Sequence, residues 1–141
     1  MTMLEPREFL KTVYLGDRAC KTLTVDCWRR ELSLEINLIS RIRDQSGRWN
    51  YYSAEDIVDG RIVIIGVQSM QLEPSGPLPN DLINEIVAKP AGLEGAGEDW
   101  LFEISINSVA ANGTNTEVVL RVVGRDVYLE DPSRRGLRIR E

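Results

Sequence analysis

Hydrophobic and polar residues alternate along most of the chain, and a period of two is typical of strands with one buried and one exposed face. The alternation is clearest in Leu32–Leu38, where every second residue is leucine or isoleucine. It also predicts strands over residues 19–26, 100–109 and 117–130. Asn112–Gly113 is a strong hairpin signal between the last two of these. The chain is therefore expected to be mainly β.

The longest apolar run, Ile62–Val67, predicts a central strand that is covered on both faces. Gly66 interrupts this run, and the alternation also changes phase at Leu38–Ile39 and near Gly124. Such changes are typical of β-bulges, which bend a strand. We therefore expect one strongly curved antiparallel sheet, or a flattened barrel or sandwich, of about six to eight strands.

Few segments have the period of a helix. In Pro6–Val13 the apolar residues fall on one stripe, which predicts a short helix that packs on the sheet. Ser53–Gly60 starts like a capped helix and predicts one or two helical turns. Residues 80–88 fit either a helix capped by Asn80 or a turn followed by a strand. Because the segment is short and runs into Pro90, we favour the turn and strand.

The composition is that of a soluble globular protein: 141 residues, of which 43% are hydrophobic and 28% charged. This length suits a single domain over residues 1–141 with its own core. The longest apolar run is far shorter than the roughly 20 residues of a membrane-spanning helix. The N-terminus lacks the basic and apolar regions of a secretory signal, so a cytoplasmic location is expected.

The net charge of the chain is −5, and it is unevenly distributed. Residues 131–141 carry +2, which leaves −7 on the remainder. An acidic body repels phosphate backbones, so nucleic-acid binding is not expected, whereas a basic protein partner would suit it. The simpler explanation, which we favour, is that the acidity keeps the protein soluble. The segment 131–141 is either a flexible basic tail or paired with the acidic surface of the protein itself.

Histidine is absent, which removes the usual general base near neutral pH, histidine-ligated metals and the Ser-His-Asp and Cys-His arrangements. Cys20 and Cys27 fall short of a zinc site, and the predicted strand between them holds them too far apart for a disulfide. We expect two free thiols, with Cys20 the more buried. Glu55, Asp56 and Asp59 lack the spacing of a calcium loop, and a solvated turn explains them. No catalytic residue, metal or cofactor is therefore predicted.

Aromatic residues in or beside predicted loops are the candidates for partner binding, because such aromatics are common anchors in protein interfaces. Two acids of the following turn are added because an acidic surface suits a basic partner. The candidate partner-binding residues are Trp28, Trp49, Tyr51, Tyr52, Glu55 and Asp56. In the alternative interpretation, the aromatics cap the ends of a small β core.

Five segments resemble a small uncharacterised bacterial family, and the resemblance covers nearly the whole chain. The segments are Phe9–Leu10, Val13–Arg18, Ile39–Ile42, Pro79–Ile83 and Val127–Pro132. The layout is also similar to that of β-rich immunity proteins of bacterial polymorphic toxin systems. The shared elements are a short leading helix, a β-hairpin, a strand ending in Gly66–Met70, a Pro-Asn-Asp turn and two long final strands. This resemblance of layout carries no catalytic residues.

We therefore expect a non-enzymatic cytoplasmic protein-binding module, such as a toxin-immunity-like inhibitor that masks a basic toxin-like protein with its acidic face. The alternative is a small-ligand-binding protein or a carboxylate-based enzyme that uses the concave face of the curved sheet. Neither nucleic acid nor a membrane is expected as a partner. The edges of an open sheet must be covered or paired, so a homodimer is a further alternative.

Overall fold

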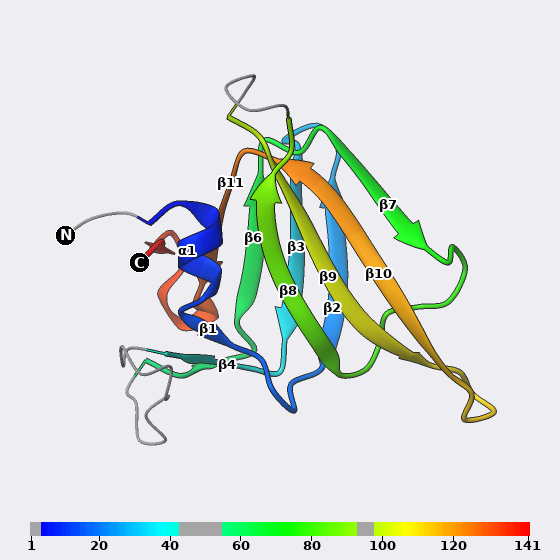
Figure 1. The fold of residues 1–141 in the computed structure, drawn as a ribbon. Coiled ribbons are helices and arrows are strands. Elements are labelled where there is room, and N and C mark those ends of the chain that lie inside the picture. Colours follow the sequence, from blue (N-terminus) through cyan, green and yellow to red (C-terminus); the bar gives the residue numbers. More distant parts are fainter. Residues whose placement is uncertain (1–3, 43–54, 93–97) are drawn as a thin grey trace.

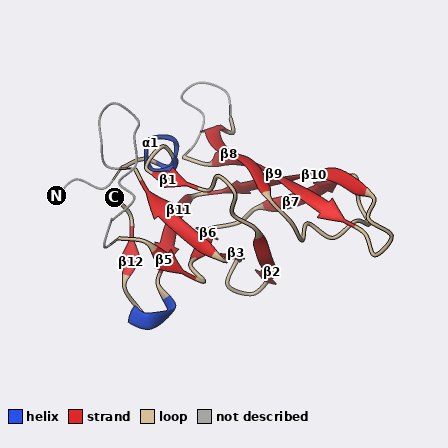
Figure 2. Cartoon of the chain, turned by 90° about the horizontal axis from the view of Figure 1, so that it is seen from below, coloured by secondary structure: helices blue, strands red, loops and turns tan. Residues whose placement is uncertain are grey.

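The computed structural model describes residues 4–42, 55–92 and 98–141. These residues form one short α-helix, one 3₁₀ turn and twelve strands in three antiparallel sheets (Figure 1). The two larger sheets form the two layers seen from below in Figure 2. In the described part of the chain, no helix is long and apolar enough to cross a membrane.

Each sheet brings together strands from distant parts of the chain. From one edge to the other, the five-stranded sheet consists of β12 (Arg138–Ile139), β11 (Asp126–Glu130), β6 (Arg61–Ile65), β3 (Glu31–Ile36) and β2 (Cys20–Asp26). The four-stranded sheet consists of β7 (Ser69–Glu73), β10 (Asn115–Gly124), β9 (Trp100–Val109) and β8 (Ile83–Pro90). The small sheet consists of β1 (Val13–Tyr14), β4 (Leu38–Arg41) and β5 (Ile57–Val58). Two helical elements complete the fold, α1 (Pro6–Leu10) and the 3₁₀ turn η1 (Pro132–Arg134).

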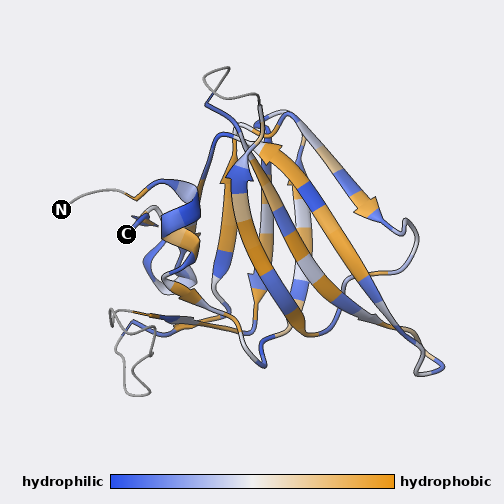
Figure 3. Cartoon of the chain, in the orientation of Figure 1, coloured by the Kyte–Doolittle hydropathy of each residue, from blue (hydrophilic) through white to orange (hydrophobic). Residues whose placement is uncertain are grey.

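The core consists of the inward residues of the two larger sheets. Along each strand these apolar residues alternate with outward polar ones, because successive side chains of a strand point to opposite faces. Figure 3 shows the alternation as bands along β9 and β10. Most of the inward residues are fully buried and belong to one cluster, which includes Leu32, Leu34, Ile62, Ile64, Phe102, Ile104, Ile106, Leu120 and Val122.

A two-stranded ribbon passes from one large sheet to the other at Gly66 and Gly124. Before the bend β6 pairs with β11, and after it β7 pairs with β10. The ladder continues through the bend, because Gln68 N–H donates to the Val123 carbonyl at 2.7 Å and Arg125 N–H donates to the Ile65 carbonyl at 2.8 Å. Gly66 has a φ of +64°, which glycine adopts at little cost.

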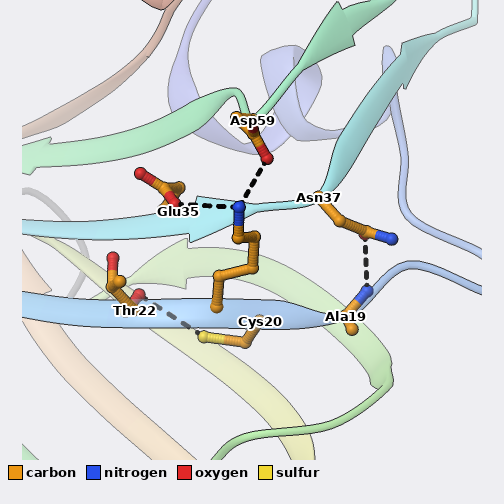
Figure 4. Close-up of polar contacts among 7 residues, drawn as sticks. Ala19, Cys20, Thr22, Glu35, Asn37 and Asp59 are labelled. Atoms are coloured by element: carbon orange, nitrogen blue, oxygen red, sulfur yellow. Dashed lines mark hydrogen bonds and ion pairs between the residues drawn. The ribbon is translucent and has the colours of Figure 1, made fainter.

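A second bend leads from the five-stranded sheet to the small sheet at Asn37 and Asp59. The Asn37 carbonyl accepts from Asp59 N–H at 3.0 Å. The Asn37 side-chain oxygen accepts from Ala19 N–H at 2.9 Å (Figure 4). The Lys21 ammonium lies 2.8 Å from Asp59 and 3.5 Å from Glu35. Its hydrogen bond to Asp59 raises the pKa of Lys21. These contacts hold the edge strand β2 across the bend.

The prediction of a mainly β, antiparallel chain with a short N-terminal helix is confirmed. Of the predicted alternatives, the single curved sheet is wrong because the described strands form three sheets, and there are twelve strands where six to eight were expected. The three phase changes in the sequence are the places where the chain leaves one sheet for another. At each of these places the bend is sharp enough that the strands before and after it belong to different sheets. On the opposite side, the two large sheets meet at an isolated bridge between Ala19 and Leu82, and the described strands form no closed barrel.

The predicted helices need two corrections. α1 ends at Leu10, and Val13 belongs to β1. The helical turns expected over Ser53–Gly60 are absent from the described residues 55–60, because Ile57 is buried and pairs with Ile39 as part of β5. Residues 53 and 54 lie outside the described residues. The turn followed by a strand that we favoured for residues 80–88 is confirmed as β8.

Arg41 is a buried cation that ties distant segments together. Its residue is only 1% exposed, and its guanidinium lies 5.5 Å from the ring centroid of Phe9. It donates to the Thr12 carbonyl at 3.3 Å, to the Thr12 hydroxyl at 2.9 Å and to the Glu141 carbonyl at 2.6 Å. A buried charge is tolerated only when it is hydrogen-bonded, so these acceptors allow Arg41 to lie inside the fold.

Replacing Ile64 by alanine should lower the free energy of unfolding by about 2–5 kcal/mol, because the side chain is fully buried between the sheets. Ile65→Ala is the matched control. Ile65 is the next residue of the same strand but points outward and is half-buried, so it should cost less than half as much. Chemical denaturation measures both values. A loss below about 1 kcal/mol for Ile64→Ala would contradict its central position.

Gly124→Ala should destabilise the protein by about 1–3 kcal/mol, because the new Cβ would lie 2.7 Å from Ile64 Cγ2 and 3.1 Å from the Ile65 carbonyl oxygen. In the double variant Gly124→Ala/Ile64→Ala, the Ile64 Cγ2 atom that the new Cβ would meet is absent. The loss of unfolding free energy in the double variant should therefore be smaller than the sum of the two single losses, by about 0.5 kcal/mol or more. Strictly additive unfolding energies would argue against this contact.

Candidate functional site

The outward face of the five-stranded sheet carries a row of alternating charges. Arg61 lies opposite Glu35 on one side and opposite Glu130 on the other, and Glu130 lies opposite Arg138. The Arg61 guanidinium is 3.1 Å from the Glu130 carboxylate and donates to the Ser33 hydroxyl at 2.8 Å. Ion pairs this exposed contribute only about 0–1 kcal/mol, so the row mainly orders the surface.

The arginine-rich segment 131–141 docks against this face. Arg138 holds its guanidinium 4.6 Å from the ring centroid of Tyr128, and Arg140 forms an ion pair with Asp126. Burial raises the pKa of the Tyr128 hydroxyl. At the start of the segment, Asp131 accepts hydrogen bonds from the side chain and the backbone N–H of Ser133, which lower the pKa of Asp131.

Two hollows of about 440 and 550 Å³ meet at the Arg61–Glu130 pair and share these two residues and Thr24. We call them together the outer groove. The first hollow has a floor of three buried residues, Ser33, Val63 and Tyr128. The second runs from Thr22 to Arg135. The groove is therefore polar, with one covered aromatic ring in its floor.

The charges that line the outer groove balance. They are Arg29, Arg61, Arg135 and Arg138, and Asp26, Glu31, Glu35 and Glu130. Asp26 lies directly opposite Glu31 across β2 and β3, and like charges in this position repel. Among the described residues, neither Glu31 nor Arg135 forms an ion pair. Both charges can therefore pair with a bound molecule.

The turn between β2 and β3 carries Trp28, which is next in sequence to the groove residue Arg29. Trp28 is 98% exposed, while its neighbour Arg29 lines the first hollow. The turn is held at both ends, because the Asp26 carboxylate accepts from Arg29 N–H at 3.0 Å and the Arg30 carbonyl accepts from Val67 N–H at 2.9 Å. An indole is thus presented to solvent on a hydrogen-bonded turn.

The outward face of the four-stranded sheet is also charged, and some of its charges are paired with one another. Arg121 lies 2.9 Å from Glu73 and 3.1 Å from Glu103, and Lys89 lies 2.8 Å from Glu103. The hydrogen bond from Lys89, followed by that from Arg121, lowers the pKa of Glu103. Glu85 and Glu117 lie on the same face and, among the described residues, form no ion pair, so the charge left over on this face is negative only.

The groups of the outer groove are polar and charged. No group of three or more His, Cys, Asp or Glu side chains among the described residues is arranged to hold a metal ion. Glu130 is held by Arg61, and the shifts of Tyr128 and Asp131 move their pKa values away from neutrality. The arrangement suits the recognition of a charged polypeptide surface, in which fixed ions of both signs specify orientation.

The structure separates the predicted partner-binding residues. Trp28 lies at the outer groove, whereas Glu55, which is exposed, and Asp56, which is half-buried, precede β5 in the small sheet beyond the other end of β3. Trp49, Tyr51 and Tyr52 lie outside the described residues. The groove residues Arg61, Tyr128 and Glu130 were missed, although Tyr128 and Glu130 occupy outward positions in a predicted strand and Arg61 directly precedes another.

Residues 3–141 match a protein-family profile described as "Family of unknown function (DUF6258)". No curated protein and no solved structure gave a match.

A thiol reagent at about pH 8 should modify one cysteine per native chain, Cys27, which is exposed on the Trp28 hairpin. Burial raises the pKa of Cys20 to about 11, so its thiol stays protonated and covered until the protein unfolds. Mass spectrometry of the labelled protein measures this, and Cys27→Ser should abolish the native reaction. Equal labelling rates for both thiols would contradict the buried position of Cys20.

Proposed function

The chain belongs to the family of unknown function DUF6258, and we propose that it is a non-enzymatic, cytoplasmic protein-binding module. In this proposal it holds its partner with the Trp28 hairpin and the outer groove. The observation that carries the proposal is the 98% exposure of Trp28 beside a groove with unpaired charges. Tryptophan is among the residues most often found at the energetic centre of protein interfaces.

The binding free energy expected from covering Trp28 supports a role for this residue in partner binding. A tryptophan side chain buries about 150–250 Å² when it is covered. At roughly 25 cal/mol per Å² this gives about 4–6 kcal/mol before the entropic costs of association. Because hydrogen bonds already fix both ends of the turn, little further ordering is needed when a partner binds.

The chemistry of the partner follows from charge. The chain outside residues 131–141 carries −7, and such a field speeds the approach of a basic protein. At the groove itself the charges balance, so they select the orientation of the partner. We propose a toxin-immunity-like inhibitor that binds a basic toxin-like protein. The supports are this charge distribution and the similarity of layout to immunity proteins.

A second candidate is a small polar ligand in the outer groove, and it would make the chain a ligand-binding protein or a carboxylate-based enzyme. The observation in its favour is the size of the hollows, about 440 and 550 Å³, which is typical of ligand sites. The inward faces of the large sheets hold the apolar core, so a polar site of this kind fits the outward face.

Trp28→Ala should weaken binding of the protein partner at least tenfold, because it removes the exposed indole. Affinity capture from the native cells with mass spectrometry identifies the partner, and calorimetry with the purified pair measures the dissociation constant. Leu78→Ala is the control, since Leu78 is 72% exposed but lies in the loop that follows β7. Both variants should keep the stability of the native protein.

Two results would count against the proposal. One is capture of no protein partner from the native cells. The other is a captured partner whose affinity is unchanged by Trp28→Ala. The immunity-like role needs a further result, since the protein should neutralise a toxic partner in co-expressing cells and Trp28→Ala should lose that protection.

A further inference from the structure

The two large sheets have four outer edges, and three of them are guarded against pairing with another chain. β12 has only two residues. β2 has a register shift between Cys20 and Thr22 and carries Lys21. β8 has a register shift between Ile83 and Glu85, ends in Lys89–Pro90 and packs beside α1. Bulges, charges, prolines, short length and cover are the usual protections of an edge strand.

The fourth edge, β7, lacks these protections. Its five residues pair with β10 without a register shift, and within the described residues β10 is its only neighbour in the sheet. Figure 1 shows β7 as the outermost strand on that side of the molecule. β7 contains neither lysine nor proline, and its single charge, Glu73, is already paired with Arg121. Met70 is 38% exposed on the inward face of this edge.

The sequence of β7 is complementary to itself in an antiparallel register centred on Gln71. In that register Glu73 lies opposite Ser69 of the second copy, so like charges do not meet. Met70 lies opposite Leu72 of the second copy, and by symmetry Leu72 lies opposite Met70 of the second copy. Both contacts cover apolar side chains that are partly exposed in the single chain. A register centred on Glu73 would instead place two carboxylates in direct opposition.

We infer that the protein forms a symmetric homodimer in which two β7 strands pair about Gln71 and join the two four-stranded sheets into one. The occupant of the open edge is thus a second copy of this chain. Self-association of the chain tests this inference, whereas binding of a different protein tests the proposed function, so either can fail without the other.

Light scattering coupled to gel filtration tests the inference on the full chain. The expected mass is twice 15.9 kDa. Met70→Lys should raise the dimer dissociation constant at least tenfold, because each copy then presents a cation to an apolar contact. Val87→Lys is the matched control, since Val87 is also 38% exposed but lies on β8, and it should leave the dimer intact. Circular dichroism verifies that both variants fold.

Disulfide trapping tests the register. In a Cys27→Ser background, Gln71→Cys should give a covalent dimer under mild oxidation, because directly opposed residues of antiparallel strands lie about 4.5–5.5 Å apart. Ser69→Cys should not give a covalent dimer, because position 69 of the second copy lies four residues away along the paired strands. A monomer at all concentrations, a dimer unaffected by Met70→Lys, or equal trapping at positions 69 and 71 would overturn the inference.

Discussion

The close approach of two backbone segments at Gly66 and Gly124 determines the architecture of this protein. A side chain at Gly124 would collide with Ile64 and with the Ile65 carbonyl, and one at Gly66 would lie 2.8 Å from Arg125 Cβ. The absence of these side chains lets the ribbon turn over without a clash and place β7 and β10 in a different layer from β6 and β11. The shared core, the exposed outward faces and the free position of β7 all follow from this turn.

Much of the fold could be predicted from local patterns, because alternation depends only on which face of a strand is buried. The phase changes at Leu38–Ile39, Gly66 and Gly124 also marked the bends correctly. How far the chain bends at each of these points was not predictable, because a mild bulge and a passage from one sheet to another give the same local sequence pattern. Ile57 shows a related limit. Its conformation is decided by pairing with Ile39, which is distant in sequence, and this pairing overrides a local helix-start pattern.

The candidate site was predictable only where a residue stands out by itself. Trp28 was found because it falls in a short turn between two alternating segments. Arg61 and Glu130 look like ordinary outward residues of their strands, and their meaning appears only when the register places them opposite each other. The cover provided by residues 131–141 depends likewise on contacts such as that between Arg138 and Tyr128, which composition does not reveal.

Arg41 has a consequence for how the chain reaches its native state. Its hydrogen bond to the Glu141 carbonyl joins residues 100 positions apart, and its bonds to Thr12 join residues 29 positions apart. Closing a loop of this size costs conformational entropy, and this entropy is lost before the contact contributes any stabilisation. Until both loops have closed, the guanidinium needs water for the hydrogen bonds that Thr12 and Glu141 later provide. The buried guanidinium of Arg41 therefore links three segments that lie far apart in the sequence, namely the end of α1, β4 and the C-terminal segment.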